Sequence, residues 1–154
     1  MTAPTATTVP AHPPTAGVGD TLPALTIEAT PTFIVSTALA TRDFQDVHHD
    51  RDLAHAKGSK DIFVNILTDT GLVGRYVASW AGQRAQIRSI TLRLGVPWYA
   101  YDTLTFSGTV SALDAGTATV DVVGTNSLGK HVTSRVVVEL DHTAVDHSAG
   151  KGRS

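Results

Sequence analysis

The sequence contains no cysteine among its 154 residues. This absence excludes disulfide bonds, thiol nucleophiles and thiolate metal sites. Long apolar runs are also missing, because no stretch approaches the roughly 20 residues that span a bilayer. A strong charge of either sign is lacking as well: the net charge is −2, and the lysines and arginines are scattered. Without a basic stripe, the chain does not have the composition of a nucleic-acid-binding domain.

The two ends of the chain have little to bury. Residues 1–19 consist mostly of threonine, alanine and proline, and residues 142–154 are small and polar. We therefore expect two disordered tails around a single folded domain at 20–141. Residues 1–19 also lack the charged start and apolar core of a signal peptide, so we expect a cytoplasmic protein.

The first half of the domain predicts a strand, a loop and a long helix. Residues 32–40 are apolar and β-branched, which favours a strand. Residues 43–58 are polar and end at a glycine, which indicates a loop with a short helical turn. Residues 61–82 repeat apolar side chains at helical spacing, with Asp61 as the expected cap and Gly82 as the expected end. We expect the small residues Gly71 and Gly74 to let this helix lie close against a sheet.

The second half alternates apolar and polar residues in four segments. They span 85–96, 103–113, 117–126 and 131–140, with turns at 114–116 and 127–130. This pattern predicts an antiparallel meander. The chain is therefore expected to be an α+β protein in which a curved sheet wraps one long helix. Such a sheet has two exposed edges, so we also expect it to pair with a second sheet.

Two adjacent histidines stand among carboxylates in the stretch DFQDVHHDRDLA at 43–54. Three interpretations are open: a solvated charged turn, a metal site built from His48, His49 and Asp50, or an acid/base pair of Asp43 and His48. Adjacent loop residues rarely point at one ion, which weighs against the metal site. Asp50 and Asp52 are expected to cap or solvate a short helix. Four of the other histidines, at positions 55, 131, 142 and 147, carry no motif.

The pattern D-x4-H-x-D-x3-A, formed here by Asp43, His48, Asp50 and Ala54, resembles that of the MaoC-like enoyl-CoA hydratases, which have the hot-dog fold. The family pattern is G-D-x-N-P-[IL]-H-x-D-x3-A. The resemblance covers most of residues 20–140, including the helix and the segment PWYAYDTLTFSG. Within the family, the stretches TFIVSTALATRDFQDVHHDRD, GSKDIFVNILTDTGLVGRYV and LRLGVPWYAYDTLTFSG are similar to small subunits of actinobacterial heteromeric hydratases of cholesterol side-chain degradation. This chain departs from the family pattern at Arg42, Gln45, Asp46, Val47, Val64 and Asn65.

The resemblance implies a function and a set of site residues. It implies a subunit that adds water across the α,β double bond of a steroid side-chain acyl-CoA, with Asp43 and His48 as the acid/base dyad. The backbone N–H of Asn65, where the family has glycine, would bind the thioester oxygen. No cofactor is expected, since CoA is part of the substrate. The implied partner is a second MaoC-like subunit, fused to an OB-fold domain that recruits a thiolase-like aldolase.

Several alternatives stay open beside this interpretation. Val64, Trp98 and Tyr99 are candidate pocket residues, and Trp98, Tyr99 and Tyr101 form either a core or interface cluster or a wall for a bulky acyl group. Ser107 and Ser111 have no motif of a nucleophile around them. The chain could instead be a homodimeric hydratase for another enoyl-CoA, or a non-catalytic acyl-CoA-binding or scaffolding hot dog. A hot-dog thioesterase is the weakest alternative.

Overall fold

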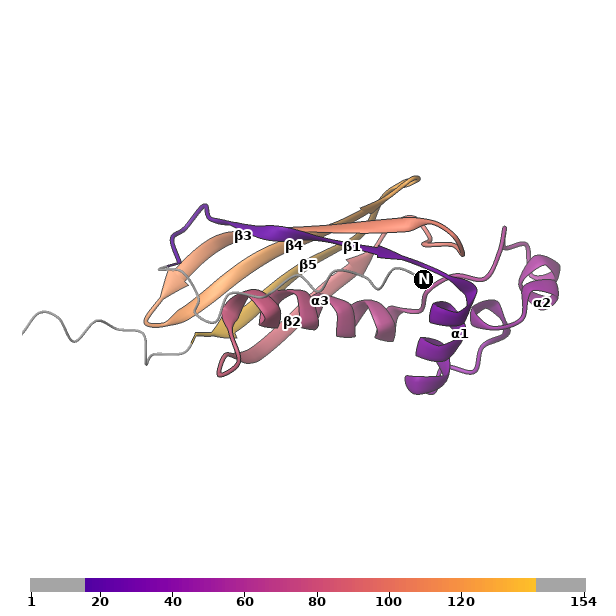
Figure 1. The fold of residues 1–154 in the computed structure, drawn as a ribbon, viewed down its shortest axis with the longest axis horizontal. Coiled ribbons are helices and arrows are strands. Elements are labelled where there is room, and N and C mark those ends of the chain that lie inside the picture. The colour runs from indigo at the N-terminus through magenta and orange to yellow at the C-terminus, as the bar shows by residue number, and fades with distance from the viewer. Residues whose placement is uncertain (1–15, 141–154) are drawn as a thin grey trace, which may run out of the picture.

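The computed structural model describes residues 16–140. Five strands form one antiparallel sheet in the order β1-β3-β4-β5-β2. The long helix α3 lies along one face of that sheet, and α1 and α2 gather at one end of the molecule (Figure 1). The elements are β1 (Thr21–Glu28), α1 (Pro31–Ala40), the 3-10 helix η1 (Asp46–His48), α2 (Arg51–Ala56), α3 (Ile66–Ala81), β2 (Gln86–Leu94), β3 (Thr103–Asp114), β4 (Thr117–Asn126) and β5 (Gly129–Glu139).

The core lies between α3 and one face of the sheet. Burial along β3 and β4 alternates residue by residue, so only one face of these strands is covered. The buried face of α3 supplies Leu72, Val73, Tyr76, Val77 and Ala81. A Cβ at Gly74 would stand 3.3 Å from Ile90 Cδ1, whereas one at Gly71 would meet nothing within 4 Å. The prediction of close helix–sheet packing therefore holds at Gly74 and not at Gly71.

The predicted strands of the second half are confirmed, with ends that differ by a residue or two. Strands β3, β4 and β5 form the predicted meander, but β2 pairs with β5 and not with β3. This crossover places β1 and β2 at the two edges of the sheet. The loop with a short helical turn at 43–58 is also confirmed, as η1 and α2, and Gly58 follows with φ 83°.

The predicted strand at 32–40 is wrong, because these residues form helix α1. Thr30 caps the helix by accepting a hydrogen bond from the N–H of Phe33 at 3.1 Å, and Pro31 occupies the first turn, where its missing N–H costs nothing. Ile34 and Ala38, one helical turn apart, are the two buried residues. The β-branched composition of the segment favours a strand, but the cap at Thr30 and the proline at position 31 favour a helix, and the helix forms.

Strand β1 was not predicted. It is an edge strand whose pairing with β3 shifts register between Leu22 and Leu25, so its burial does not alternate cleanly. Pro23 lies within that shift, where no ladder hydrogen bond is lost.

The predicted cap of the long helix is also wrong. The helix starts at Ile66 and is capped by Asn65, while Asp61 accepts from the N–H of Ile62 and pairs with Arg51. The end at Gly82 is confirmed, with φ 98°. Within residues 16–140, no helix is long and apolar enough to cross a membrane.

Candidate active site

The C-terminal turn of α1 fixes the direction in which Asp43 leaves the helix. The N–H of Arg42 donates to the carbonyl of Leu39 at 3.0 Å, and the N–H of Asp43 donates to that of Ala38 at 2.9 Å. Arg42 itself is left-handed, with φ 58°. These two hydrogen bonds and the left-handed residue make a Schellman motif, in which Asp43 is the second residue beyond the cap, Thr41.

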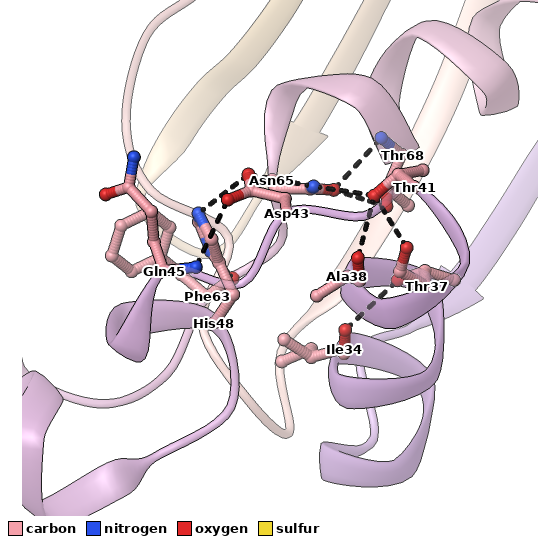
Figure 2. Close-up of polar contacts among 10 residues, drawn as sticks. All are labelled: Ile34, Thr37, Ala38, Thr41, Asp43, Gln45, His48, Phe63, Asn65 and Thr68. Atoms are coloured by element: carbon pink, nitrogen blue, oxygen red, sulfur yellow. Dashed lines mark hydrogen bonds and ion pairs between the residues drawn. The ribbon is translucent and has the colours of Figure 1, made fainter.

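His48 is held by its Nδ1 atom on the buried end of η1. Nδ1 lies 2.8 Å from the carbonyl oxygen of Phe63, and the Phe63 ring packs edge-on against the imidazole at 4.9 Å. Since a carbonyl can only accept, Nδ1 carries the proton of this bond, and Nε2 is left to face the site. His48 Nε2 lies 3.4 Å from Asp43 Oδ2 (Figure 2). Their side chains are 8% and 19% exposed, so solvent reaches the pair mainly from the carboxylate side.

Asn65 joins this pair to the start of α3. Its Nδ2 donates to Asp43 Oδ2 at 3.0 Å and to Thr41 Oγ1 at 2.9 Å, and its Oδ1 accepts from the N–H of Thr68 at 3.0 Å (Figure 2). The backbone N–H of Asn65 donates no hydrogen bond to any residue of 16–140. It stands at the positive end of the α3 dipole, where an oxyanion is stabilised.

The structure therefore brings together the three residues predicted for the chemistry. Asp43, His48 and Asn65 come from three separate segments and meet in one network. The solvated-turn interpretation of 43–54 does not describe His48, which is buried and hydrogen-bonded at its ring nitrogen. Adjacent His49 is exposed, and Asp50 caps α2 by accepting from the N–H of Leu53 at 3.0 Å, as predicted. Among the described residues, no three His, Asp or Glu side chains are placed to hold a metal ion.

The three tentative pocket residues have different environments. Trp98 is completely buried, donates from Nε1 to the carbonyl of Asp102 at 3.1 Å and packs against the rings of Phe33 and His131. Val64 is also buried, and its N–H donates to the carbonyl of Trp98 at 3.0 Å. Both therefore belong to the core, and the alternative of an acyl wall does not describe Trp98.

Tyr99 is partly exposed, and its ring lies 6.2 Å from that of Phe63, which in turn packs against His48. Tyr99 and the exposed Tyr101 line a surface pocket of about 240 Å³ that also includes Lys60, Asp61, Ser127 and Leu128. Neither Asp43 nor His48 lines that pocket. Tyr99 therefore stands near the dyad but faces a different hollow.

Large apolar side chains are exposed on the segments that carry the dyad. Phe44, which follows Asp43, is 61% exposed, and Ile66 and Leu67, which follow Asn65, are 49% and 50% exposed. Leu39, in the last turn of α1, is 53% exposed. Exposed large apolar side chains of this kind are typical of a surface that binds an apolar ligand or another chain.

His131 and Asp69 form a second buried pair that the sequence did not indicate. His131 Nε2 lies 3.0 Å from Asp69 Oδ2, and the two side chains are 2% and 0% exposed. Asp69 lies one turn after Asn65 on α3, and His131 lies on β5, so the pair joins the helix to the sheet. Sixty-two positions separate them, and no local motif points to such a contact.

The chain resembles characterised proteins along most of its length, although no protein-family model matches it. It is 70% identical, over 123 residues, to the 3-oxo-4,17-pregnadiene-20-carboxyl-CoA hydratase beta subunit of Mycobacterium tuberculosis, covering 80% of this chain and 95% of that protein. A crystal structure of the ChsH1–ChsH2 complex from Mycobacterium tuberculosis contains a chain that is 69% identical, with a TM-score of 0.80 over 81% of this chain and 98% of that one.

The fold extends to more distant structures. The (R)-hydratase from A. caviae involved in PHA biosynthesis is 22% identical, with a TM-score of 0.72 over 82% of this chain and 98% of that one. The predicted hot-dog fold is thereby confirmed, with a five-stranded antiparallel sheet around a central helix. The identity to the mycobacterial beta subunit over almost all of its length shows that this chain belongs to the MaoC-like hot-dog hydratases.

Proposed function

We propose that this chain is the catalytic small subunit of a heteromeric enoyl-CoA hydratase acting on a steroid side-chain acyl-CoA. The observation that carries the proposal is the orientation of His48, whose Nδ1 is bound to a carbonyl and whose Nε2 faces Asp43 at 3.4 Å. The steroid substrate is taken from the relative that is 70% identical, whose name specifies 3-oxo-4,17-pregnadiene-20-carboxyl-CoA.

The geometry supports a division of roles within the dyad. With Nδ1 protonated, neutral His48 has its free electron pair on Nε2, where it can accept a proton from water. Asp43, beside Nε2, orients that water. As the water oxygen bonds to the β-carbon, His48 takes one of its protons, and the π electrons of the double bond shift toward the thioester. One proton then passes from the pair to the α-carbon, so that the dyad returns to its starting state.

The negative charge that develops on the thioester oxygen needs hydrogen-bond donors. The backbone N–H of Asn65 supports this role, since it has no acceptor within residues 16–140 and stands at the N-terminus of α3. Because the donor belongs to the backbone, an asparagine supplies it as well as a glycine does. The predicted role of Asn65 is thus retained as part of the proposal.

The partner in this proposal is a second MaoC-like subunit. Support comes from the related chain in the ChsH1–ChsH2 complex and from the exposed apolar side chains around the dyad. The two sheet edges, β1 and β2, are open for pairing in the single chain. An OB-fold domain on that partner, an aldolase recruited through it, and a cytoplasmic location remain predictions, as do the tails at 1–19 and 142–154, most of which lies outside the described residues.

An assay of the hydration of 3-oxo-4,17-pregnadiene-20-carboxyl-CoA tests the proposal. The reaction is monitored through the loss of enoyl-thioester absorbance. The chain is assayed alone, with its co-purified MaoC-like partner, and as His48→Ala in both formats. We expect activity only with the partner, and its loss in His48→Ala. Activity of the chain alone would instead indicate a homodimeric hydratase. Partner-dependent activity that survives His48→Ala would make this chain a non-catalytic subunit.

A further inference from the structure

Asn65 uses all of the hydrogen-bonding capacity of its side chain in the active-site network. Its two amide protons go to Asp43 Oδ2 and Thr41 Oγ1, at 3.0 and 2.9 Å. Its oxygen accepts from the N–H and the hydroxyl of Thr68. The orientation of the amide is unambiguous, because a backbone N–H can only donate and a carboxylate can only accept. A glycine at this position would make none of these bonds.

The Asp43 carboxylate depends on this amide for its position. Its other polar contacts are longer: 3.4 Å from Oδ2 to His48 Nε2 and 3.4 Å from Oδ1 to the N–H of Gln45. Asp43 is also the more exposed member of the dyad. The strongest restraint on the carboxylate within the described residues is therefore the bond from Asn65 Nδ2.

The amide is itself anchored on two helices. Thr41 Oγ1, which accepts from Nδ2, donates to the carbonyl of Thr37 at 2.8 Å in the last turn of α1. Thr68, which donates to Oδ1, lies in the first turn of α3, and Asn65 is only 3% exposed. Displacement of Asn65 would thus disturb the end of one helix and the start of the other.

We propose that the Asn65 side chain is the positioning residue of the dyad. It holds the Asp43 carboxylate at a fixed place relative to the N-terminus of α3. One side-chain amide therefore sets the position of the acid/base pair relative to the backbone N–H that donates to the thioester oxygen. This inference rests on the proposed hydratase function. It goes beyond the backbone role of Asn65, since it assigns a separate task to the side chain.

Two variants separate this task from helix capping. Asn65→Asp and Asn65→Ser both keep an oxygen that can cap α3, but they lose the amide nitrogen that donates to Asp43. Asn65→Asp also places a like charge beside the Asp43 carboxylate. We expect kcat of the complex to fall about 100-fold in Asn65→Asp and less in Asn65→Ser, since misplacement of a reacting group by about 1 Å costs that much. KM should change little, because the amide acts on the dyad and not on the bulk of the substrate.

Thr30→Ala is the matched control, because it removes the side-chain cap of α1 at the end far from the dyad. Its Tm should fall while kcat stays at the wild-type value. The proposal is overturned if kcat of both Asn65 variants stays within about threefold of wild type. It is also overturned if Thr30→Ala, at an equal loss of Tm, loses as much kcat as the Asn65 variants do. If neither Asn65 variant folds, Thr41→Val decides, because it keeps the size of the side chain and removes the hydroxyl that anchors the amide, together with the bonds of that hydroxyl to the last turn of α1: a kcat equal to wild type would overturn the proposal.

The two proposals fail in different ways. A wild-type complex that does not hydrate the steroid enoyl-CoA contradicts the proposed function. A wild-type complex that is active and sensitive to His48→Ala, but indifferent to Asn65→Asp, contradicts only the positioning role of Asn65.

Discussion

Asp69 and His131 face each other in the interior, with 3.0 Å between Asp69 Oδ2 and His131 Nε2. His131 Nδ1 lies 2.6 Å from the carbonyl of Val96, so Nδ1 carries a proton, and the contact with Asp69 requires a second one. Burial alone would lower the pKa of His131, but the hydrogen bond to Asp69 and the charge of that carboxylate outweigh burial and raise the pKa. For Asp69, burial is the dominant influence and raises the pKa. Both directions mean that the folded pair retains its shared proton.

Stability should therefore decrease as the pH rises above about 6.5. In the unfolded chain His131 releases its proton near its ordinary pKa of 6.5, whereas the folded chain keeps the proton to a higher pH. The folded state then binds more protons than the unfolded state, which makes the free energy of unfolding fall with pH. Urea unfolding of the chain at a series of pH values between 5 and about 9 measures this slope. The control variant His49→Ala, at an exposed position, should show the same pH dependence. A free energy of unfolding that does not change between these pH values would contradict the shared proton.

The same pair predicts a non-additive double substitution. His131→Leu leaves Asp69 buried without a partner and should cost about 3–5 kcal/mol of stability. Asp69→Leu combined with His131→Leu removes the lone carboxylate and should cost clearly less than His131→Leu alone. Denaturant titrations of the two variants and the wild type provide the comparison. If the double variant is the least stable, the pair contributes more than the cost of burying its charges.

The left-handed conformation of Arg42 predicts a stabilising glycine. Arg42 has φ 58° at the position of the Schellman motif that usually holds glycine, and a side chain costs about 1 kcal/mol there. Arg42→Gly should raise the free energy of unfolding by about 0.5–1 kcal/mol, after the greater freedom of glycine in the unfolded chain is included. Arg42→Ala is the matched control, because it removes the guanidinium but keeps the Cβ. Equal stability of Arg42→Gly and Arg42→Ala would exclude backbone strain as the cause.

The hydroxyl of Tyr76 predicts a tolerated substitution in the core. It is buried beside the backbone of Gly108, without a hydrogen bond of acceptable geometry among the described residues, while the ring stacks on Phe106 at 5.7 Å. Burial raises the pKa of Tyr76 to about 12. Tyr76→Phe keeps the ring and removes a polar group that is not satisfied, so the Tm should stay constant or rise. Tyr76→Ala should lose about 3–5 kcal/mol through the cavity. A large loss in Tyr76→Phe would reveal a partner for the hydroxyl.

The strands of the second half and the proximity of Asp43 to His48 were predictable because their signals are local. Alternation along 103–113 and 117–126 reports one buried face directly, and Asp43 and His48 stand in a short pattern. The N-terminal half was harder. In α1, β-branched residues favoured a strand, and the opposing signal was only Thr30 with Pro31. For α3, Asp61 and Asn65 are both capable caps, and the sequence does not tell which one precedes the first turn.

The contacts that organise the site were beyond the sequence for a physical reason. Asn65 meets Thr41 across 24 positions and Asp43 across 22, and such contacts exist only once α1 and α3 have packed. The pair of Asp69 and His131 depends in the same way on the docking of α3 on β5. Trp98 looked equally suited to a wall and to a core, and the distinction came from its neighbours, Phe33 and His131.

The Schellman turn couples the length of α1 to the position of Asp43 in the proposed dyad. Each residue of an α-helix advances the chain by about 100° around the axis. Asp43 follows α1 through a turn of fixed geometry, so one residue added to or removed from Pro31–Ala40 would swing the carboxylate about a quarter-turn away from His48. If Asp43 and His48 form the proposed dyad, the number of residues between Thr30 and Asp43 must stay constant, and differences in length among related chains are expected in the outer loops and not in this segment.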